Sequence, residues 1–387
     1  MPHTTDTETQ LQNNAMAALV IVAARLSIGL LAAKIAFAFF RHGPWIFPLN
    51  EVNWLSLFNH WDSVWYIGIA QSGYTSLMSH AFYPVYPLLI RVCSPIFGYM
   101  GATLAVSWLA AVFAVWGVID ISQRFASARS SWMAGFLLAW NPVSIFFIAG
   151  YPESILVATM VWSLRFCLDR RWMSAALLAA VASAIMPQGI VAAIIVSIAI
   201  MTSERRWKVV LKAMVYGAIG ESGIILYLIY CFVTTGSVLV SLKAEKVGWN
   251  NHITYPFHML VAITGNLLNG IHSSNVIAVD LVNLMSGIIG IIVLGISVIM
   301  ILKDRKLVLP VVLLTLGVLV SMSTIDQSLQ NSARFTFFQA PLYIIGAVLI
   351  DKVAKSSKMV IMTHVVAITV AVSLFYGALF TNGWWLT

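Results

Sequence analysis

Apolar residues occur in long continuous runs along most of this 387-residue chain, and short polar stretches separate the runs. Runs of this kind predict helices that cross a bilayer, because about 20 apolar residues span its hydrocarbon core. The runs are continuous and too long for the alternating strands of a membrane barrel. We therefore expect an all-α polytopic membrane protein with about 11 transmembrane helices, over residues 16–39, 101–121, 132–149, 154–168, 173–185, 188–202, 209–232, 276–302, 307–323, 334–350 and 359–380.

The order of these runs predicts a single integral membrane domain over residues 1–387. Residues 1–15 form a mostly polar tail without Lys or Arg, and we expect no cleavable signal peptide there. Residues 40–100 and 233–275 form two long loops rich in Trp, Tyr, Phe, Pro and His, which is typical of backbone in the headgroup region. Loops of this length are usually functional.

The charged residues predict the orientation. Hydrophobic residues make up 60% of the chain and charged residues 9%, whereas about a quarter of an average soluble protein is charged. The net charge is +8, but most of the 22 Lys and Arg residues lie in short loops on one side of the expected membrane, so they indicate topology and not nucleic-acid binding. That side is cytoplasmic, which places the N-terminus in the cytoplasm and both long loops outside, at the cell membrane if the chain is prokaryotic. The cations expected outside are Arg41, Arg91, Lys243, Lys246 and Arg334.

Two of the runs, 173–185 and 188–202, are short. A helix of 13 residues covers about 20 Å, whereas the hydrocarbon core is about 30 Å thick. Their outer ends meet at Met186-Pro187-Gln188-Gly189, where proline interrupts the helix. We expect a recess that opens toward the outer leaflet. The alternative is that both runs form one kinked helix. This would reverse the orientation of every later segment in the membrane, and Lys and Arg would no longer be concentrated on one side.

Carboxylates on the outer side are candidate functional groups, because an acid beside lipid is costly. They are Glu51, Asp62, Glu153, Glu245, Asp280 and Asp326. Asp62 stands out because it lies between two indoles in Asn59–Tyr66, where partial dehydration favours a general base. The alternative role for Asp62 is the N-cap of an interfacial helix.

Three further outer residues could contact a substrate. Glu153 lies at the outer turn of a hairpin that begins near Asn141, and its alternative role is to interact with a helix dipole. Arg91 follows the proline-rich Tyr83–Pro87 and could bind a phosphate or simply extend to the interface. Arg334 lies at the start of an apolar run, where the dipole disfavours a cation, so we expect a phosphate or Asp326 beside it.

The remaining polar residues indicate structural roles. Arg25 and Lys34, inside the first run, are expected to pair with Glu221. The cysteines (Cys93, Cys167, Cys231) have no CxxC spacing, and a Cys93–Cys231 bridge has no support. The outer histidines have no HxxxH spacing, which argues against zinc. No P-loop, GxGxxG or GxSxG motif occurs, so no nucleotide cofactor or esterase chemistry is indicated.

An ordered series of motifs resembles the PIG-V mannosyltransferase family, which adds the second mannose of glycosylphosphatidylinositol, and its prokaryotic relatives. The series comprises His60–Ala70, Gly73-Tyr74, Ala81–Arg91, Asn141–Phe147, Tyr151–Ser154 and Ala182–Gly189, with weaker matches at Gly236, Lys243–Glu245 and Ala333–Phe335. The chain departs from the family pattern at Met186, where the family commonly has Arg. This departure leaves an altered substrate or reduced activity open.

The resemblance implies a GT-C-like fold whose long first outer loop carries interfacial helices. It also implies an inverting glycosyltransferase that moves a sugar, usually mannose, from a polyprenyl-phosphate donor to a lipid or glycan acceptor, with Asp62 as the catalytic acid of the Trp-Asp motif. We expect the substrate-binding residues to be His60, Trp61, Trp65, Tyr83, Tyr86, Arg91, Asn141, Glu153, Gln188 and Arg334.

Two other functions stay open from the sequence. A transporter or flippase of a lipid-linked sugar would have the same composition, but such proteins often contain internal repeats, and we find no convincing repeat. An inactive accessory subunit is the other alternative, which Met186 favours. The sequence does not identify the sugar, the acceptor, a metal requirement or the oligomeric state.

Overall fold

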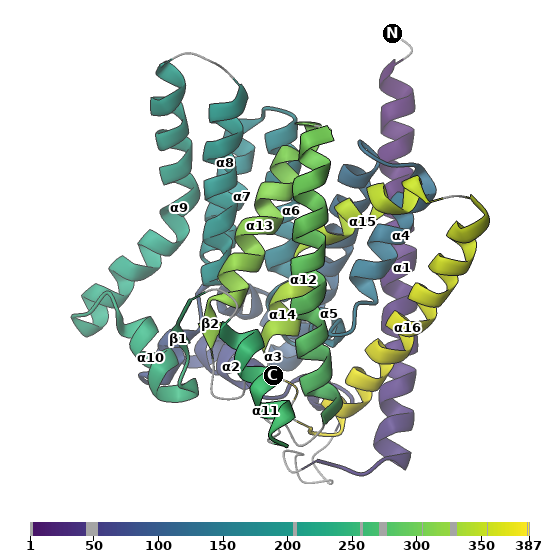
Figure 1. Cartoon of the computed structure of the whole chain (residues 1–387). Coiled ribbons are helices and arrows are strands. Elements are labelled where there is room, and N and C mark those ends of the chain that lie inside the picture. The colour runs from purple at the N-terminus through teal and green to yellow at the C-terminus, as the bar shows by residue number, and fades with distance from the viewer. Residues whose placement is uncertain are drawn as a thin grey trace.

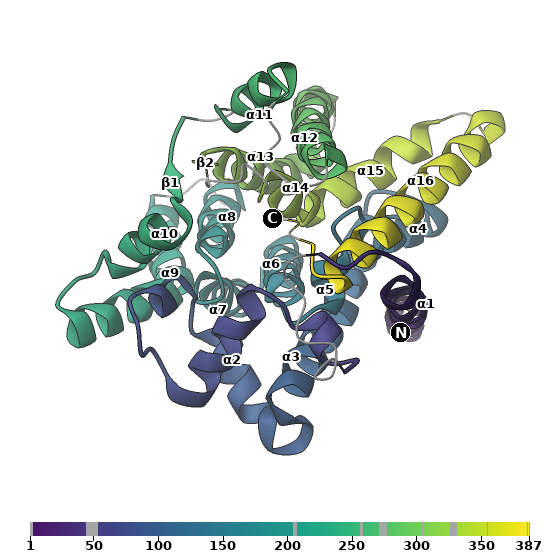
Figure 2. The ribbon, with the colours of Figure 1, turned by 90° about the horizontal axis from the view of Figure 1, so that it is seen from below.

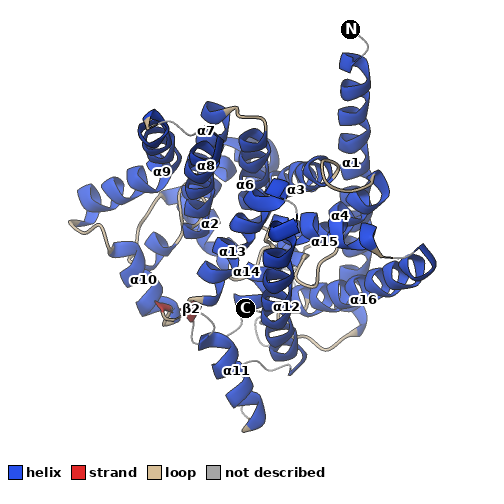
Figure 3. Cartoon of the chain, turned by 45° about the horizontal axis from the view of Figure 1, so that its top comes forward, coloured by secondary structure: helices blue, strands red, loops and turns tan. Residues whose placement is uncertain are grey.

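The computed structural model consists almost entirely of helices (Figures 1 and 3). It describes residues 3–43, 53–203, 207–255, 258–270, 277–303, 305–325, 331–353, 355–384 and 386. Within these ranges two short strands, β1 (His252–Ile253) and β2 (Thr324–Ile325), pair antiparallel. The predicted all-α class is therefore confirmed, with one small two-stranded ladder added.

The long and medium helices follow the predicted apolar runs closely. They are α1 (His3–Phe39), α3 (Val85–Ser122), α4 (Ala128–Ala139), α6 (Glu153–Leu168), α7 (Trp172–Ser183), α8 (Ile190–Ser203), α9 (Lys208–Thr235), α12 (Ile277–Lys303), α13 (Val308–Met322), α15 (Ala340–Lys352) and α16 (Lys355–Thr381). The shorter elements are η1 (Ser56–Phe58), α2 (Asp62–Ser72), η2 (Met78–Ala81), α5 (Ile145–Ile148), η3 (Pro187–Gly189), α10 (Val240–Trp249), α11 (His258–Leu268), η4 (Arg305–Leu307) and α14 (Asn331–Phe337).

Three predicted runs differ from the observed helices. The run 101–121 belongs to a helix that starts at Val85 and kinks at Gly98, whose φ of 66° a glycine adopts at little cost. The run 132–149 divides into α4 and α5 because Asn141 caps the break: its Nδ2 donates to the Leu138 carbonyl, and its Oδ1 accepts from the Val143 N–H. The run 334–350 divides into α14 and α15.

Five helices in the described ranges are long and apolar enough to cross a membrane, namely α1, α3, α9, α12 and α16. Shorter apolar helices pack between them, and α6 is almost fully buried against α3, α7 and α8. Helices α7 and α8 have only 12 and 14 residues and meet at η3. The prediction of two short segments that end at Pro187 is confirmed.

The described parts of the two long loops lie at one end of the bundle, the lower end in Figure 1, with α2, α10, α11 and α14. At the opposite end α1 continues past the predicted start of its run. Gln10 and Asn14, in the predicted polar tail, bond to Gln123 at the end of α3, with distances of 2.7 and 2.9 Å to its Oε1. These bonds attach the tail helix to the bundle.

The predicted ion pair between α1 and Glu221 is wrong. Helices α1 and α9 lie on opposite sides of the bundle (Figure 2). Arg25 instead donates from Nε to Ser144 Oγ at 3.2 Å, and Lys34 is exposed. The apolar context of all three residues suggested a pair, but only the order of helix packing decides which helices meet.

Replacing Gly189→Ala should destabilise the fold. An added Cβ would lie 2.0 Å from the carbonyl oxygen of Ala182, so the contact between η3 and the end of α7 would have to open. Overpacking of this kind costs about 1–3 kcal/mol, and we expect a lower melting temperature of the detergent-solubilised protein. Gly346→Ala is the matched control, because nothing lies within 4 Å of its added Cβ. Equal melting temperatures for the two variants would contradict the close approach at η3.

Candidate active site

Three charged side chains from distant parts of the chain meet at the lower end of the bundle. Arg334 of α14 bonds through Nη1 to Asp62 Oδ2 at 3.2 Å and through Nε to Glu153 Oε1. Helices α2, α6 and α14, which carry the three residues, surround the centre of the end view (Figure 2). The Asp62 side chain is 19% exposed, whereas those of Arg334 and Glu153 are 6% and 3% exposed. Asp62 is therefore the member that a substrate can reach most easily.

Local structure places both carboxylates at helix starts. Glu153 is the first residue of α6, directly after Pro152. Asp62 is the first residue of α2, but Trp61 occupies the cap position and no side chain caps the helix. The alternative role for Asp62, an N-cap, is therefore wrong. Trp61 has a φ of 50°, which is unfavourable for a side chain of this size.

Tyr151 contacts both the backbone at the start of α2 and the Arg334 guanidinium. Its hydroxyl accepts the N–H of Asp62 at 3.3 Å and donates to the carbonyl of His60 at 3.2 Å. The Arg334 Cζ lies 4.9 Å from the Tyr151 ring centroid and 4.8 Å from that of Phe146. Sequence reasoning missed Tyr151 and Phe146 as site residues, although both lie inside the motifs around Asn141 and Glu153.

Arg334 reaches the site from α14, a seven-residue helix between two longer ones. The N–H of Ala333 donates to Asn283 Oδ1 of α12 at 2.9 Å, which anchors α14. Arg334 therefore does not begin a long apolar helix, as the sequence suggested. Its expected structural partner Asp326 lies outside the described residues, and so does Glu51, a carboxylate expected on the outer side.

Several other predicted site residues pack against, or bond to, their neighbours in the fold. Tyr86 is buried, and its hydroxyl bonds to the Thr103 carbonyl and Ser107 Oγ. The Trp65 ring stacks on Phe82 with centroids 5.8 Å apart. Tyr83 is buried against Tyr227 of α9, with ring centroids 4.8 Å apart. Since Asn141 also bonds to neighbouring backbone, these residues have structural partners already.

Two predicted site residues lie apart from the ion network, the group formed by Asp62, Glu153 and Arg334. Arg91 is exposed on the first part of α3, and the ion pairs of the described residues do not include it. Gln188 lies in η3, and its buried Oε1 has no hydrogen-bond partner there. Met186, just before η3, is partly buried against the hydrophobic core.

His60 and Trp61 lie against Phe380, near the end of α16. The ring centroids of His60 and Trp61 are 5.6 and 4.8 Å from that of Phe380. His60 is 3% exposed, and this burial lowers its pKa to about 4. The imidazole is therefore neutral near pH 7.

The described residues contain no group of three His, Cys, Asp or Glu side chains placed to hold a metal ion. All three cysteines are free, so the unsupported Cys93–Cys231 bridge is not formed. The chemistry that the site offers is that of two carboxylates and one guanidinium.

Asp62, Tyr151 and Glu153 all lie within one stretch of the chain that matches a known family. Residues 49–240, about half of the chain, match the family model "Mannosyltransferase (PIG-V)". The chain belongs to the PIG-V mannosyltransferase family. The expected family is thereby confirmed, and Arg334 lies outside the matched stretch.

Two curated relatives share part of this stretch. GPI mannosyltransferase 2 of Drosophila pseudoobscura pseudoobscura is 32% identical over 123 residues, which are 29% of this chain and 27% of the relative. GPI mannosyltransferase 2 of Drosophila melanogaster is 29% identical over 107 residues, which are 24% of each chain. The similarity therefore spans about a quarter of each relative.

Solved structures of the Archaeoglobus fulgidus oligosaccharyltransferase are similar in fold. The apo form matches with a TM-score of 0.51 at 10% identity, covering 94% of this chain and 56% of that one. A complex with an inhibitory peptide and a dolichol-phosphate matches with a TM-score of 0.50, also at 10% identity and with the same coverage. The predicted GT-C-like fold is thereby confirmed.

Replacing Arg334→Met should destabilise the protein. The variant leaves the Glu153 carboxylate buried, and the described residues offer it no other charge partner. Breaking a buried pair in this way costs about 3–5 kcal/mol, which should appear as a lower melting temperature in detergent. Arg91→Met is the control, because that arginine is exposed. Glu153→Gln should recover part of the loss in the Arg334→Met background, and no recovery would contradict the pairing.

The stability of the fold should decrease as the pH falls from about 6.5 to about 4. The folded pKa of His60, about 4, lies below its ordinary value of 6.5, so the unfolded chain binds the extra proton first. The loss is at most about 3 kcal/mol across this range. The free energy of unfolding, measured by chemical denaturation at several pH values, should depend less on pH in His60→Gln than in the wild type. Replacement of the exposed His364 by Gln should leave the dependence unchanged.

Proposed function

We propose that this protein transfers a sugar, mannose in our assignment, from a polyprenyl-phosphate donor to a hydroxyl group of a lipid or glycan acceptor. The reaction inverts the configuration at the anomeric carbon and takes place on the extracytoplasmic face of the membrane. The observation that carries the proposal is the ion network itself, in which an accessible carboxylate lies beside a buried arginine at one end of a membrane bundle. Membership in a mannosyltransferase family supports the reaction class.

Asp62 is the general base in this proposal. Its Oδ2 accepts a hydrogen bond from Arg334, and the side-chain hydrogen bonds of the described residues include no donor to Oδ1. An acceptor hydroxyl can therefore donate to Oδ1 while its oxygen attacks the anomeric carbon. The Tyr151 contact to the Asp62 backbone fixes the direction of the carboxylate. Orientation of this kind lowers the entropy cost of the reaction.

Arg334 stabilises the leaving group in this proposal. As the C–O bond to the sugar breaks, the polyprenyl phosphate takes the bonding electrons and gains negative charge, which a guanidinium stabilises. Nε and Nη1 are occupied by the two carboxylates, whereas Nη2 has no acceptor among the described residues and can bind a phosphate oxygen. Glu153 is a positioning residue, because it holds the arginine. We assign no role in this step to Arg91.

The charge distribution supports the proposed orientation. Arg165 lies in the last turn of α6, the helix that Glu153 begins, so it pairs with Asp120 and Asp169 at the end of the bundle opposite the ion network. Cytoplasmic loops carry an excess of Lys and Arg. The Asp62 end therefore faces away from the cytoplasm, on the side where we place both substrates.

Two features support a lipid-borne donor. The structures that share this fold include one in complex with a dolichol-phosphate. In addition, the first part of α3 has an exposed apolar surface that includes Leu88, Val92 and Ile96, as expected for a helix at the bilayer interface. A donor that stays in the membrane can then approach the site from the side.

Replacing Asp62→Asn should lower the transfer rate about a hundred- to ten-thousand-fold, the usual effect of losing a general base. The folded protein should persist, because Asn keeps the shape of the side chain. The measurement is product formation by purified protein in detergent, with polyprenyl-phosphate mannose and a set of acceptor glycolipids.

Asp169→Asn is the matched control, because Asp169 lies at the far end of the bundle. Unchanged turnover of Asp62→Asn would refute the assigned base. Detergent removes the two compartments that a flippase needs, so the absence of any product in the wild type, together with lipid translocation in vesicles, would favour the transporter.

A further inference from the structure

Arg25 is a cation buried in the middle of a membrane helix. It is 2% exposed, and α1 is one of the helices long and apolar enough to cross a membrane. The Arg25 Cζ lies 5.1 Å from the Trp140 ring centroid, and Nε bonds to Ser144. The ion pairs of the described residues do not include Arg25. Charged groups in membrane segments are usually paired, so this guanidinium needs a negative partner.

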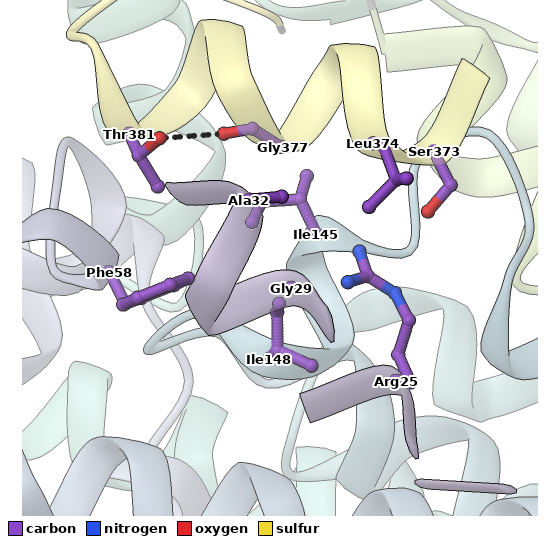
Figure 4. Close-up of a pocket in the computed structure, with 10 residues that line it drawn as sticks. All are labelled: Arg25, Gly29, Ala32, Phe58, Ile145, Ile148, Ser373, Leu374, Gly377 and Thr381. Carbon is purple, nitrogen blue, oxygen red and sulfur yellow. Dashed lines mark hydrogen bonds between the residues drawn. The ribbon is translucent and has the colours of Figure 1, made fainter. Parts of the chain in front are cut away.

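The guanidinium points toward a small cavity between α1, α5 and α16 (Figure 4). Its Nη2 is buried and has no hydrogen-bond partner. The centre of a water-sized sphere has about 10 Å³ of free space in this cavity, so one monatomic occupant somewhat larger than water fits. Residues that line it include Arg25, Gly29, Ile145, Ile148, Ser373 and Thr381.

Gly29 and two serines shape this space. A Cβ on Gly29 would lie 2.4 Å from Arg25 Nη1 and 2.9 Å from Ile148 Cδ1, so a larger residue would displace the guanidinium. Ser144 accepts a hydrogen bond from Arg25, and its Oγ lies 2.8 Å from Ser373 Oγ. When Ser144 donates to Ser373, the Ser373 hydroxyl can donate to an occupant of the cavity.

We propose that this cavity binds a small monovalent anion of halide size, held by Arg25 Nη2 and the Ser373 hydroxyl. A water molecule would satisfy the hydrogen bonds but would leave the charge uncompensated. Phosphate and other polyatomic anions exceed the volume. The site is distinct from the ion network: Ile145 and Ile148 of α5 line the cavity, whereas Phe146 of the same turn contacts Arg334. The bound anion neutralises Arg25 and stabilises the packing of α5 between α1 and α16.

The test is the melting temperature of the full-length protein in detergent, in sodium chloride, sodium bromide or sodium gluconate at the same ionic strength. Gluconate is too large for the cavity. Chloride and bromide should raise the melting temperature of the wild type by a few degrees, in a saturable way. Arg25→Met should show no such shift. Lys34→Met, which removes an exposed cation from the same helix, should behave like the wild type.

Equal melting temperatures of the wild type in all three salts would overturn the proposal, and so would the same halide shift in Arg25→Met. If Arg25→Met fails to fold, crystals of the wild type in bromide decide the question. An anomalous peak within hydrogen-bonding distance of Arg25 Nη2 supports the site, and its absence at saturating bromide overturns it. Neither readout involves sugar transfer, so failure here leaves the proposed enzymatic function untouched.

Discussion

The bond between Arg334 and the two carboxylates is the contact on which the arrangement of the site depends. It joins α14 near the C-terminal end of the chain to α2 and α6 in the first half. Glu153 and Arg334 are almost fully buried, so each charge requires the other. Asp62 is the more exposed partner, and the arginine restricts the positions that its carboxylate can take. A buried pair thus supports one accessible carboxylate.

The two long loops meet near this carboxylate. Trp249, at the end of α10, lies 5.5 Å from Phe82 and 6.2 Å from Trp65, measured between ring centroids. The ladder of β1 with β2 joins the second loop to the chain segment that leads toward α14. Aromatic contacts and a few backbone bonds therefore connect loops that are far apart in the sequence. Such contacts exclude water from the neighbourhood of a polar network, which strengthens its electrostatic interactions.

Much of the fold could be predicted from the sequence, because apolar runs and proline report helix positions directly. The short helices that meet at Pro187 were visible in this way, and Asp62, Glu153 and Arg334, which the structure brings together, stood out as charged residues outside the basic loops. The sequence could not show that Arg334 bridges both carboxylates, since this depends on how α14 packs against α12 and α13. The same limit explains the wrong pair of Arg25 with Glu221. Tyr151 was missed because an aromatic residue in the turn before a helix has no distinctive pattern of its own.

Trp61 adds a further consequence. Its backbone has a φ of 50°, a conformation that costs a bulky residue about 1–3 kcal/mol. The chain turns at this residue so that Asp62 begins α2 facing the arginine. Random substitutions that relax this turn would make the protein more stable while letting the carboxylate drift. With Asp62 in its proposed role as general base, selection for stability and selection for turnover act in opposite directions at this position, and screens for thermostable variants would favour inactive ones there.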